Sequence, residues 1–268
     1  AMVGHSIGEY VAACMAGMLS PADAAAAVAA RGRFMQQSQW GAMLSVLASV
    51  EQMRPRLGED LWVATVNSPT SCVVSGQELA VQALAEELEA EGIGHRRLQT
   101  SHAFHSPAME PAAVQLVDFL AGIEFSPLQL PVCSTLTGQW MDERNTNAQY
   151  WGDQLRQPVL FADALATVLQ DPNTVLLEVG PGQALTSAAQ TQLAPGQQWR
   201  AIATFPRKPG VGNEQQTTLA ALGSLWEAGA VVDREALTRY TARPVVDLPT
   251  YAFQRTRHWV DPVTAPLS

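Results

Sequence analysis

The 268-residue sequence is poor in cysteine, in basic side chains and in long apolar runs. Its 3 cysteines, Cys14, Cys72 and Cys133, are odd in number and widely spaced, which argues against a disulfide framework or a zinc site. Its 16 Lys and Arg against 25 Asp and Glu give a formal charge of −9, and this lacks the basic surface that nucleic-acid binding requires. No apolar run reaches the ~20 residues of a transmembrane helix.

These shortages predict a protein with reduced thiols that binds neither nucleic acid, nor membrane, nor metal. No basic amino-terminal region or transit-like segment opens the chain, so we expect a cytoplasmic location. The hydrophobic share of 47% and the length allow a large core, in one large domain or two smaller ones.

Alternating helical and extended patterns predict an α/β fold. Extended runs at 43–48, 62–66, 71–75 and 95–99 surround a helix expected at 78–91, which indicates a ferredoxin-like small subdomain over 43–104. It is predicted to be inserted into an α/β-hydrolase-like large subdomain with a mainly parallel sheet, formed by 1–42 and 105–242. The tail over 243–268 is expected to be a linker.

Further elements are predicted for the large subdomain. Two helices are expected between residues 7 and 35, broken at Gly17 and restarted with Ser20 as N-cap and Pro21 as first helical residue. Beyond the small subdomain we expect a helix near 112–121, a strand at 130–134, a helix from about 163 and a strand at 174–179.

The motif Gly-His-Ser-Ile-Gly at 4–8 predicts a nucleophile elbow, because it follows an apolar tripeptide and precedes helix-forming residues. In such an elbow two glycines allow close backbone approach, and the hydroxyl of Ser6 is exposed above a sheet. Only three residues precede the motif, so we expect that an upstream part of the large subdomain is missing. An open strand edge and exposed apolar helix surface are then expected.

A serine hydroxyl needs a base that accepts its proton, so a histidine must reach Ser6. His5 is expected to be structural, and His95 and His258 are expected at the surface. His102 and His105 remain as candidates, three residues apart in an apolar, small-residue stretch. Their spacing alone does not distinguish a catalytic base from a hydrogen-bonded structural histidine.

Five short motifs follow one another along the chain. They are Gly-His-Ser-Ile-Gly-Glu-Tyr at 4–10, Arg-Gly-Arg-Phe-Met at 31–35, His-Ala-Phe-His-Ser at 102–106, Tyr-Trp with Gln-Leu-Arg-Gln-Pro-Val at 150–159, and Glu-Val-Gly-Pro-Gly at 178–182. This order is the one seen in malonyl-CoA:acyl carrier protein transacylases, and the sequence most resembles acyltransferase domains of modular polyketide synthases. The tail motif Leu-Pro-Thr-Tyr-Ala-Phe-Gln-Arg at 248–255 is similar to the linker that follows such domains and packs on a ketosynthase.

The resemblance implies a role for several of these residues. Ser6 would be the nucleophile and His105 its general base, with the imidazole oriented by an oxygen from Gln154, where polyketide synthase domains more often have Asn. Arg31 would grip the free carboxylate of the extender unit. Outside this resemblance, Gln154 is also consistent with a surface helix residue, and Arg31 with a cation at a helix C-terminus.

The resemblance also implies a preference for malonyl over methylmalonyl. His102 and Phe104 belong to the His-Ala-Phe-His run that accompanies malonyl, and Phe104 would occupy the space of an α-methyl group; ordinary core packing of Phe104 is compatible with this role. Ile7 after the serine agrees with the same preference, and its backbone N–H would be one oxyanion donor. The family's second donor comes from a glutamine upstream of the elbow, which this sequence lacks.

The sequence thus predicts transfer of malonyl from coenzyme A to the phosphopantetheine thiol of an acyl carrier protein, with no bound cofactor. The predicted partners are malonyl-CoA, the carrier protein and an adjacent ketosynthase domain of the same polypeptide. An esterase or thioesterase is an alternative, and it predicts an Asp or Glu between serine and histidine in a post-strand turn. A non-catalytic docking or scaffold fragment is the other alternative.

Overall fold

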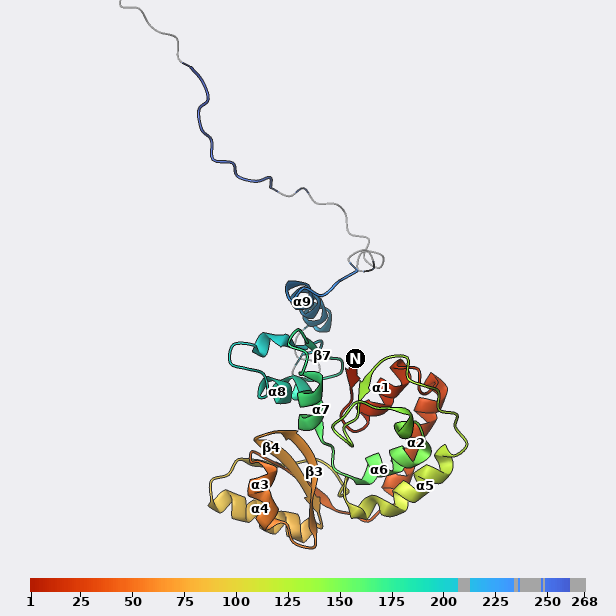
Figure 1. The fold of residues 1–268 in the computed structure, drawn as a ribbon. Helices are drawn as coiled ribbons and strands as arrows, with labels where there is room; N and C mark the ends of the chain where they lie inside the picture. Colours follow the sequence, from red (N-terminus) through yellow and green to blue (C-terminus); the bar gives the residue numbers. More distant parts are fainter. Residues whose placement is uncertain (207–212, 234–235, 237–246, 248, 261–268) are drawn as a thin grey trace, which may run out of the picture. The chain divides into compact units, whose positions relative to one another are not determined.

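A computed structural model describes residues 1–206, 213–233, 236, 247 and 249–260 of the chain. The contacts divide the chain into two units, Ala1–Ala230 and Val231–Ser268. The first unit is mixed α/β and contains every helix and strand named below (Figure 1).

The segment predicted as a small subdomain forms a four-stranded antiparallel sheet with strand order β3-β4-β2-β5. Two helices, α3 and α4, connect its strands in the βαββαβ order predicted for a ferredoxin-like subdomain. The elements are β2 (Ala42–Val46), α3 (Val50–Met53), β3 (Leu61–Ser68), β4 (Ser71–Gly76), α4 (Glu78–Ala90) and β5 (His95–Arg97).

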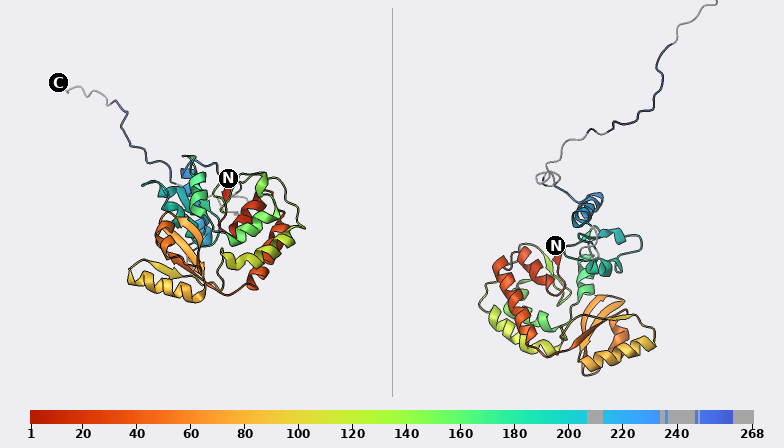
Figure 2. Two further views of the ribbon diagram at one scale, coloured as in Figure 1. Left: turned by 60° about the horizontal axis from the view of Figure 1, so that its bottom comes forward. Right: turned by 180° about the vertical axis from the view of Figure 1, so that it is seen from behind.

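The two faces of this sheet have different neighbours because successive side chains of a strand alternate between faces. On β2, Leu44 and Val46 pack in one core with Met53 of α3 and Leu84 of α4. Both helices therefore cover the same face of the sheet (Figures 1 and 2). Met43, on the opposite face, packs with a second cluster and lines a cavity described below.

The parallel strands of the first unit form two separate pairs. Strand β1 (Met2–Val3) pairs with β6 (Val132–Cys133), and β7 (Leu176–Glu178) pairs with β8 (Ala201–Ala203). The predicted α/β fold with parallel pairing in the large subdomain is confirmed, and within the described residues the parallel strands form these short pairs. The expected open edge is present, because β1 has a single partner strand within the described part of the chain.

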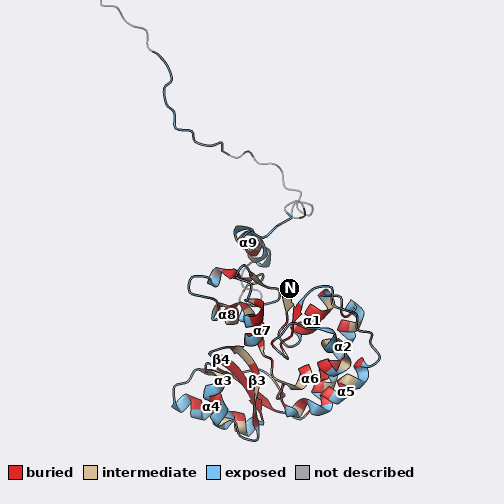
Figure 3. Ribbon diagram, viewed as in Figure 1, coloured by how far each residue is buried: buried red, intermediate tan, exposed pale blue. Residues whose placement is uncertain are grey.

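Helices form most of the remaining core. Tyr10, Met18, Leu116 and Trp151 are fully buried in one apolar cluster (Figure 3). The expected apolar helix surface is also present, since Val11 and Met15 of α1 are exposed. The helices are α1 (Gly8–Met15), α2 (Pro21–Gln36), α5 (Glu110–Leu120), α6 (Ala148–Arg156), α7 (Phe161–Val168), α8 (Ala184–Gln190) and α9 (Glu214–Glu227).

Local sequence signals fix the start of α2 as predicted. Ser20 is its N-cap and accepts a hydrogen bond from the backbone N–H of Asp23 at 3.1 Å, and Pro21 is its first residue. Gly17, which separates α1 from α2, has φ of 81°, a conformation that glycine adopts without steric cost.

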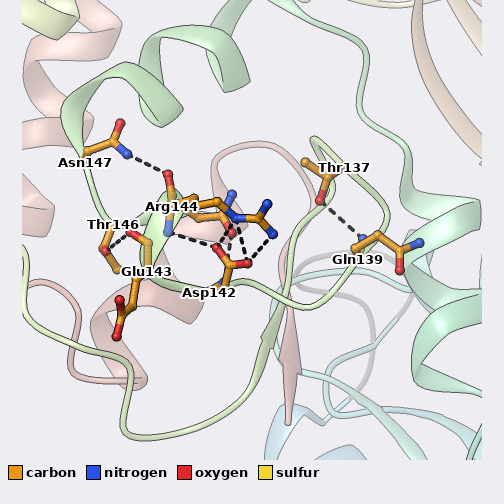
Figure 4. Close-up of polar contacts among 8 residues, drawn as sticks. Thr137, Gln139, Asp142, Glu143, Arg144, Thr146 and Asn147 are labelled. Atoms are coloured by element: carbon orange, nitrogen blue, oxygen red, sulfur yellow. Dashed lines mark hydrogen bonds and ion pairs between the residues drawn. The ribbon is translucent and has the colours of Figure 1, made fainter.

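A polar turn fixes the start of α6, which carries a predicted site residue. Asp142 and Asn145 form a reciprocal capping box, and Arg144 donates to the Asp142 carboxylate (Figure 4). Asn147 then caps α6 by accepting from the backbone N–H of Tyr150 at 3.0 Å. This turn therefore sets where α6 begins and which of its residues face the core.

The second unit has few described residues. The rings of Tyr251 and Phe253 pack edge to face with centroids 4.9 Å apart, and both side chains are exposed. Of the predicted linker over 243–268, residues 243–246, 248 and 261–268 lie outside the described residues. The predicted subdomain and linker boundaries stay predictions. No helix of the described part is long and apolar enough to cross a membrane.

Candidate active site

The nucleophile elbow forms between β1 and α1. Ser6 has φ of 50°, in the left-handed region that non-glycine residues rarely adopt and that marks strained turns at active sites. A Cβ on Gly4 would lie 2.3 Å from the backbone nitrogen of Glu9, so only glycine fits there. A Cβ on Gly8 would meet nothing within 4 Å, so close backbone approach requires Gly4 and not Gly8.

The structure brings Ser6 and His105 together across 99 positions of sequence. Ser6 Oγ lies 2.8 Å from His105 Nε2, and His105 is itself in the left-handed region with φ of 56°. Burial, followed by the nearby basic side chains of Arg31 and His5, lowers the pKa of His105 to about 3. The imidazole is therefore neutral at physiological pH and can accept the serine proton.

A backbone carbonyl orients this imidazole. His105 Nδ1 lies 3.1 Å from the carbonyl oxygen of Gln157, just after α6, which makes Nδ1 the protonated nitrogen and leaves Nε2 as the acceptor. The esterase alternative requires a carboxylate at this place, and among the described residues the imidazole has none.

The predicted orienting role of a Gln154 oxygen stays a prediction, and the backbone of Gln154 does interact with the His105 imidazole. The side-chain amide of Gln154 donates to the backbone carbonyl of Ser6 at 2.8 Å and lies 3.4 Å from the Glu9 carboxyl. Gln154 is only 2% exposed, so it is not a surface helix residue. It braces the elbow, while the end of the same helix supplies the carbonyl that holds the base.

A buried polar cluster lies directly below the elbow and was missed from the sequence. Glu9 is fully buried and accepts a hydrogen bond from Thr135 at 2.6 Å and another from the Tyr150 hydroxyl. Burial raises the pKa of the Glu9 carboxyl, and these hydrogen bonds oppose part of that shift. A glutamate among the apolar residues of α1, directly after the motif, was the signal that could have indicated this cluster.

Arg31 reaches Ser6 from α2. Its Nη2 donates to Ser6 Oγ at 3.2 Å, although the side chain is only 6% exposed. The Nε of Arg31 has no hydrogen-bond acceptor, and no carboxylate of the described residues pairs with this guanidinium. Burial lowers the pKa of Arg31, and an unpaired buried guanidinium is a ready site for an anionic ligand. The alternative of a cation that only interacts with the helix C-terminus does not account for the hydrogen bond to Ser6.

Ile7 is placed where the resemblance expects it. Its side chain is half exposed at the mouth of the site, and its backbone N–H, at the N-cap of α1, has no acceptor among the described residues. A free N–H beside the nucleophile at a helix start is suited to stabilise developing negative charge.

These groups open into a cavity of about 720 Å³, within the size range of small-molecule sites. Ser6, Arg31 and His105 lie on one side of it, and the exposed face of the four-stranded sheet forms the other. Both apolar and polar side chains line it; the former include Ile7, Met35, Met43 and Phe104, and the latter Ser45, Thr65, Asn67, Thr70 and Arg96.

The other four histidines lie in different surroundings. His102 is buried behind Phe104 and does not line the cavity, so it is placed apart from Ser6 and His105. His5 is held by Asn67 at 2.9 Å and packs on Phe161, a structural arrangement as predicted, although it also lines the cavity. His95 is partly buried and His258 is exposed.

No group of three or more metal-ligating side chains that could hold an ion is found among the described residues. The site is instead a serine and a neutral histidine beside a buried arginine, and all three line one cavity. This arrangement can transfer an acyl group through a serine ester.

Comparisons with known proteins agree with this chemistry. The model of the acyl transferase domain family matches residues 1–231. A phenolphthiocerol/phthiocerol polyketide synthase of Mycobacterium tuberculosis is 38% identical over 264 residues, 98% of this chain. The chain spans 18% of the length of that synthase polypeptide.

Solved structures show the same relationship. The acyl transferase domain of SpnD, in complex with 2-(pent-4-yn-1-yl)malonyl, is 34% identical, with a TM-score of 0.79 over 85% of this chain and 55% of that one. The malonyl CoA-acyl carrier protein transacylase of Clostridium perfringens is 25% identical, with a TM-score of 0.72 over 85% of this chain and 72% of that one. The chain therefore belongs to the acyl transferase domain family and is an acyltransferase domain of the polyketide synthase type.

Proposed function

We propose that this domain loads malonyl from malonyl-CoA onto the phosphopantetheine thiol of an acyl carrier protein, through an ester on Ser6. One observation carries the proposal. The Ser6 hydroxyl lies within hydrogen-bond distance of both a neutral base, His105, and the buried guanidinium of Arg31, which has no carboxylate partner in the described part of the chain. A nucleophile and a carboxylate receptor thus meet at one point.

The first half of the reaction acylates the serine. Ser6 Oγ attacks the thioester carbonyl carbon while its proton passes to His105 Nε2, and the Ile7 N–H stabilises the resulting oxyanion. The carbon–sulfur bond then breaks, and the imidazolium returns its proton to the departing coenzyme A thiolate. A thiolate leaves more easily than an amine, so a dyad oriented by the Gln157 carbonyl suffices.

The second half reverses these steps with a different thiol. The phosphopantetheine thiol of the carrier protein gives its proton to His105 Nε2 and attacks the malonyl ester carbon. The bond to Ser6 Oγ breaks, and the serine oxygen regains the proton. Water in place of this thiol would give hydrolysis, so the proposal includes a carrier protein bound over the cavity.

The second proposed partner of this domain is an adjacent ketosynthase domain of the same polypeptide. The proposed location of the domain is the cytoplasm.

Selection of malonyl is assigned to Arg31 and Phe104. The guanidinium would pair with the free carboxylate, and a neutral acyl chain would leave that buried charge without a partner. Phe104 lines the cavity and would fill the space that an α-methyl group needs. One methyl group in an apolar pocket changes the rate by about 10- to 200-fold, so slow loading of methylmalonyl is expected. The malonyl derivative bound to the SpnD domain supports the same substrate class.

Mass spectrometry of the intact protein, incubated with an equimolar mixture of malonyl-, methylmalonyl- and acetyl-CoA, tests the proposal. A malonyl adduct should dominate, should be absent from Ser6→Ala, and should form about 10²–10⁴ times more slowly in His105→Ala. Adding holo acyl carrier protein should then move the malonyl mass to the carrier.

Other outcomes would contradict the proposal in distinct ways. An adduct that persists in Ser6→Ala would show another nucleophile. Release of free malonate faster than transfer to the carrier would favour an esterase. Complete absence of adduct, with normal binding of the carrier protein, would favour a non-catalytic docking segment.

A further inference from the structure

Three aromatic rings form a continuous stack from the surface to the cavity. The Trp40 indole packs on the His102 imidazole with centroids 5.6 Å apart and an interplanar angle of 25°. His102 packs in turn on Phe104, at 5.9 Å and 19°. The outer ring is 76% exposed, the middle one is 2% exposed, and the inner one lines the cavity beside Ser6.

The stack lies where the chain passes between the two subdomains. Trp40 precedes β2, His102 follows β5, and their backbones form an antiparallel bridge. The Gly41 N–H donates to the Ser101 carbonyl at 3.1 Å, and a Cβ on Gly41 would lie 2.9 Å from the Ala103 Cβ. This close approach of the two crossing segments holds the indole on the imidazole.

The imidazole between the two outer rings has few other restraints. Its Nδ1 lies 2.8 Å from Ser101 Oγ, whereas its buried Nε2 has no hydrogen-bond partner among the described residues. Hydration of this nitrogen would favour an imidazole turned toward solvent. The near-parallel packing of the Trp40 indole opposes such a rotation, and an imidazole that stays in place keeps its contact with the Phe104 ring.

We propose that Trp40 is a specificity-determining positioning residue, which holds Phe104 through His102 in the position that closes the space next to the α-carbon of the acyl group. The proposal rests on the proposed function, since it assigns the selectivity of the same site. Trp40 is not among the residues that line the cavity, so it would act through His102 and Phe104 and not by contact with the acyl group. Its removal should change the choice between acyl groups much more than the rate with malonyl.

The test compares kcat/KM for malonyl-CoA and methylmalonyl-CoA in full-length chain variants. Trp40→Ala removes the stacking interaction of one aromatic pair. If that interaction is lost from the position of Phe104, the malonyl-to-methylmalonyl ratio of kcat/KM should fall by about 2- to 10-fold. Trp40→Phe keeps a stacking ring and should restore most of the ratio. Trp226→Ala is the matched control, because Trp226 on α9 is also exposed, at 60%, and has no ring neighbour in the described part of the chain.

A double-mutant comparison shows whether the effect passes through Phe104. In a Phe104→Ala background, Trp40→Ala should leave the ratio unchanged, because the ring that it supports is gone. An unchanged ratio in the Trp40→Ala single variant would overturn the proposal, as would equal effects of Trp40→Ala in the two backgrounds. Equal loss of ratio in Trp226→Ala would also overturn it.

A readout without acyl-CoA separates this inference from the proposed function. With 5-fluorotryptophan incorporated, the ¹⁹F signal that disappears in Trp40→Phe should shift in His102→Ala and in Phe104→Ala. An unmoved signal in both variants would overturn the stack even if malonyl loads normally. If the signal shifts but the unmutated protein prefers methylmalonyl-CoA, the proposed function is contradicted while the aromatic stack is confirmed.

Discussion

The two sheet regions of the first unit differ in how they are built and in what they carry. The four-stranded region has strands of 3 to 8 residues, contiguous in sequence, with its own apolar core under α3 and α4. The parallel pairs have strands of 2 or 3 residues from distant parts of the chain. Yet Ser6, Arg31 and His105 all lie outside the four-stranded sheet.

This difference indicates that the reacting groups are positioned by local strain and buried polar contacts more than by extended sheet pairing. Two residues in left-handed conformations, Ser6 and His105, meet at the site. Below them Glu9, Thr135 and Gln154 tie the elbow to two other segments. The four-stranded region contributes a wall of the cavity and no reacting atom.

The largest effect expected from a comparison of the two regions contrasts two arginines of the same cavity. Arg31→Ala should remove the carboxylate partner and lower malonyl loading about 10- to 100-fold, in line with the loss of hydrogen bonds to a charged group. Acetyl loading should fall much less, because a neutral chain gains nothing from the guanidinium. Competition between malonyl-CoA and acetyl-CoA, followed by mass spectrometry, measures the change in preference.

Arg96→Ala is the matched control. Arg96 lines the cavity from β5, but it is exposed and makes no hydrogen bond to Ser6 in the structure described. It should keep the malonyl preference. A loss of preference in Arg96→Ala, with Arg31→Ala unchanged, would assign carboxylate recognition to the four-stranded region and break the contrast between the two regions.

The sequence predicted the four-stranded region well because its signals are local. Four short extended runs, at 43–48, 62–66, 71–75 and 95–99, and the helical run of α4 were sufficient to predict a ferredoxin-like subdomain. The two-stranded parallel pairs could not be predicted in the same way. Strands of two residues carry no periodicity, and pairing of Met2 with Val132 is fixed by tertiary contacts alone.

The candidate site divides in a similar way. Ser6, His105 and Arg31 belong to recognisable motifs, and the structure places all three together. The carbonyl of Gln157 could not be predicted from residue type, since any residue supplies a backbone oxygen. The hydrogen bond from the Gln154 amide to the Ser6 carbonyl could not be predicted either, because a residue position does not determine where an amide side chain points.

A smaller effect is expected from the elbow glycines. Gly4→Ala should lower both stability and loading, because its new Cβ would overlap the backbone of Gly8 and Glu9 and overpacking costs about 1–3 kcal/mol. Gly8→Ala, with open space at its Cβ, should fold with nearly unchanged stability. Thermal unfolding and malonyl loading of both variants measure the difference.

Gly76→Ala is the counterpart in the four-stranded region, where a Cβ would lie 2.2 Å from the Asp60 carbonyl oxygen. It should lower stability while the folded fraction keeps its loading rate. Equal loss of loading per folded molecule in Gly76→Ala and Gly4→Ala would show that the sheet region also positions the reacting groups.

The smallest expected effect is that of pH on the base itself. Burial lowers the pKa of His105 from the ordinary 6.5 to about 3, so the folded protein keeps a neutral imidazole as the pH falls from 8 to 5. Initial loading per folded molecule should therefore change by less than about twofold over this range, whereas an exposed histidine would lose most of its base form. Stopped-flow loading with malonyl-CoA at each pH measures this.

Stability should respond to the same shift with a definite sign. The unfolded chain binds a proton on this histidine below pH 6.5, whereas the folded protein does not until about pH 3, so unfolding becomes easier as the pH falls between these values. His105→Gln removes this contribution and should lose less stability than the wild type over the same pH range. A loading rate that falls tenfold near pH 6.5, with no such difference in unfolding, would mean that the imidazole of His105 titrates like that of an exposed histidine, and the contrast between buried reacting groups and the four-stranded wall of the cavity would then fail.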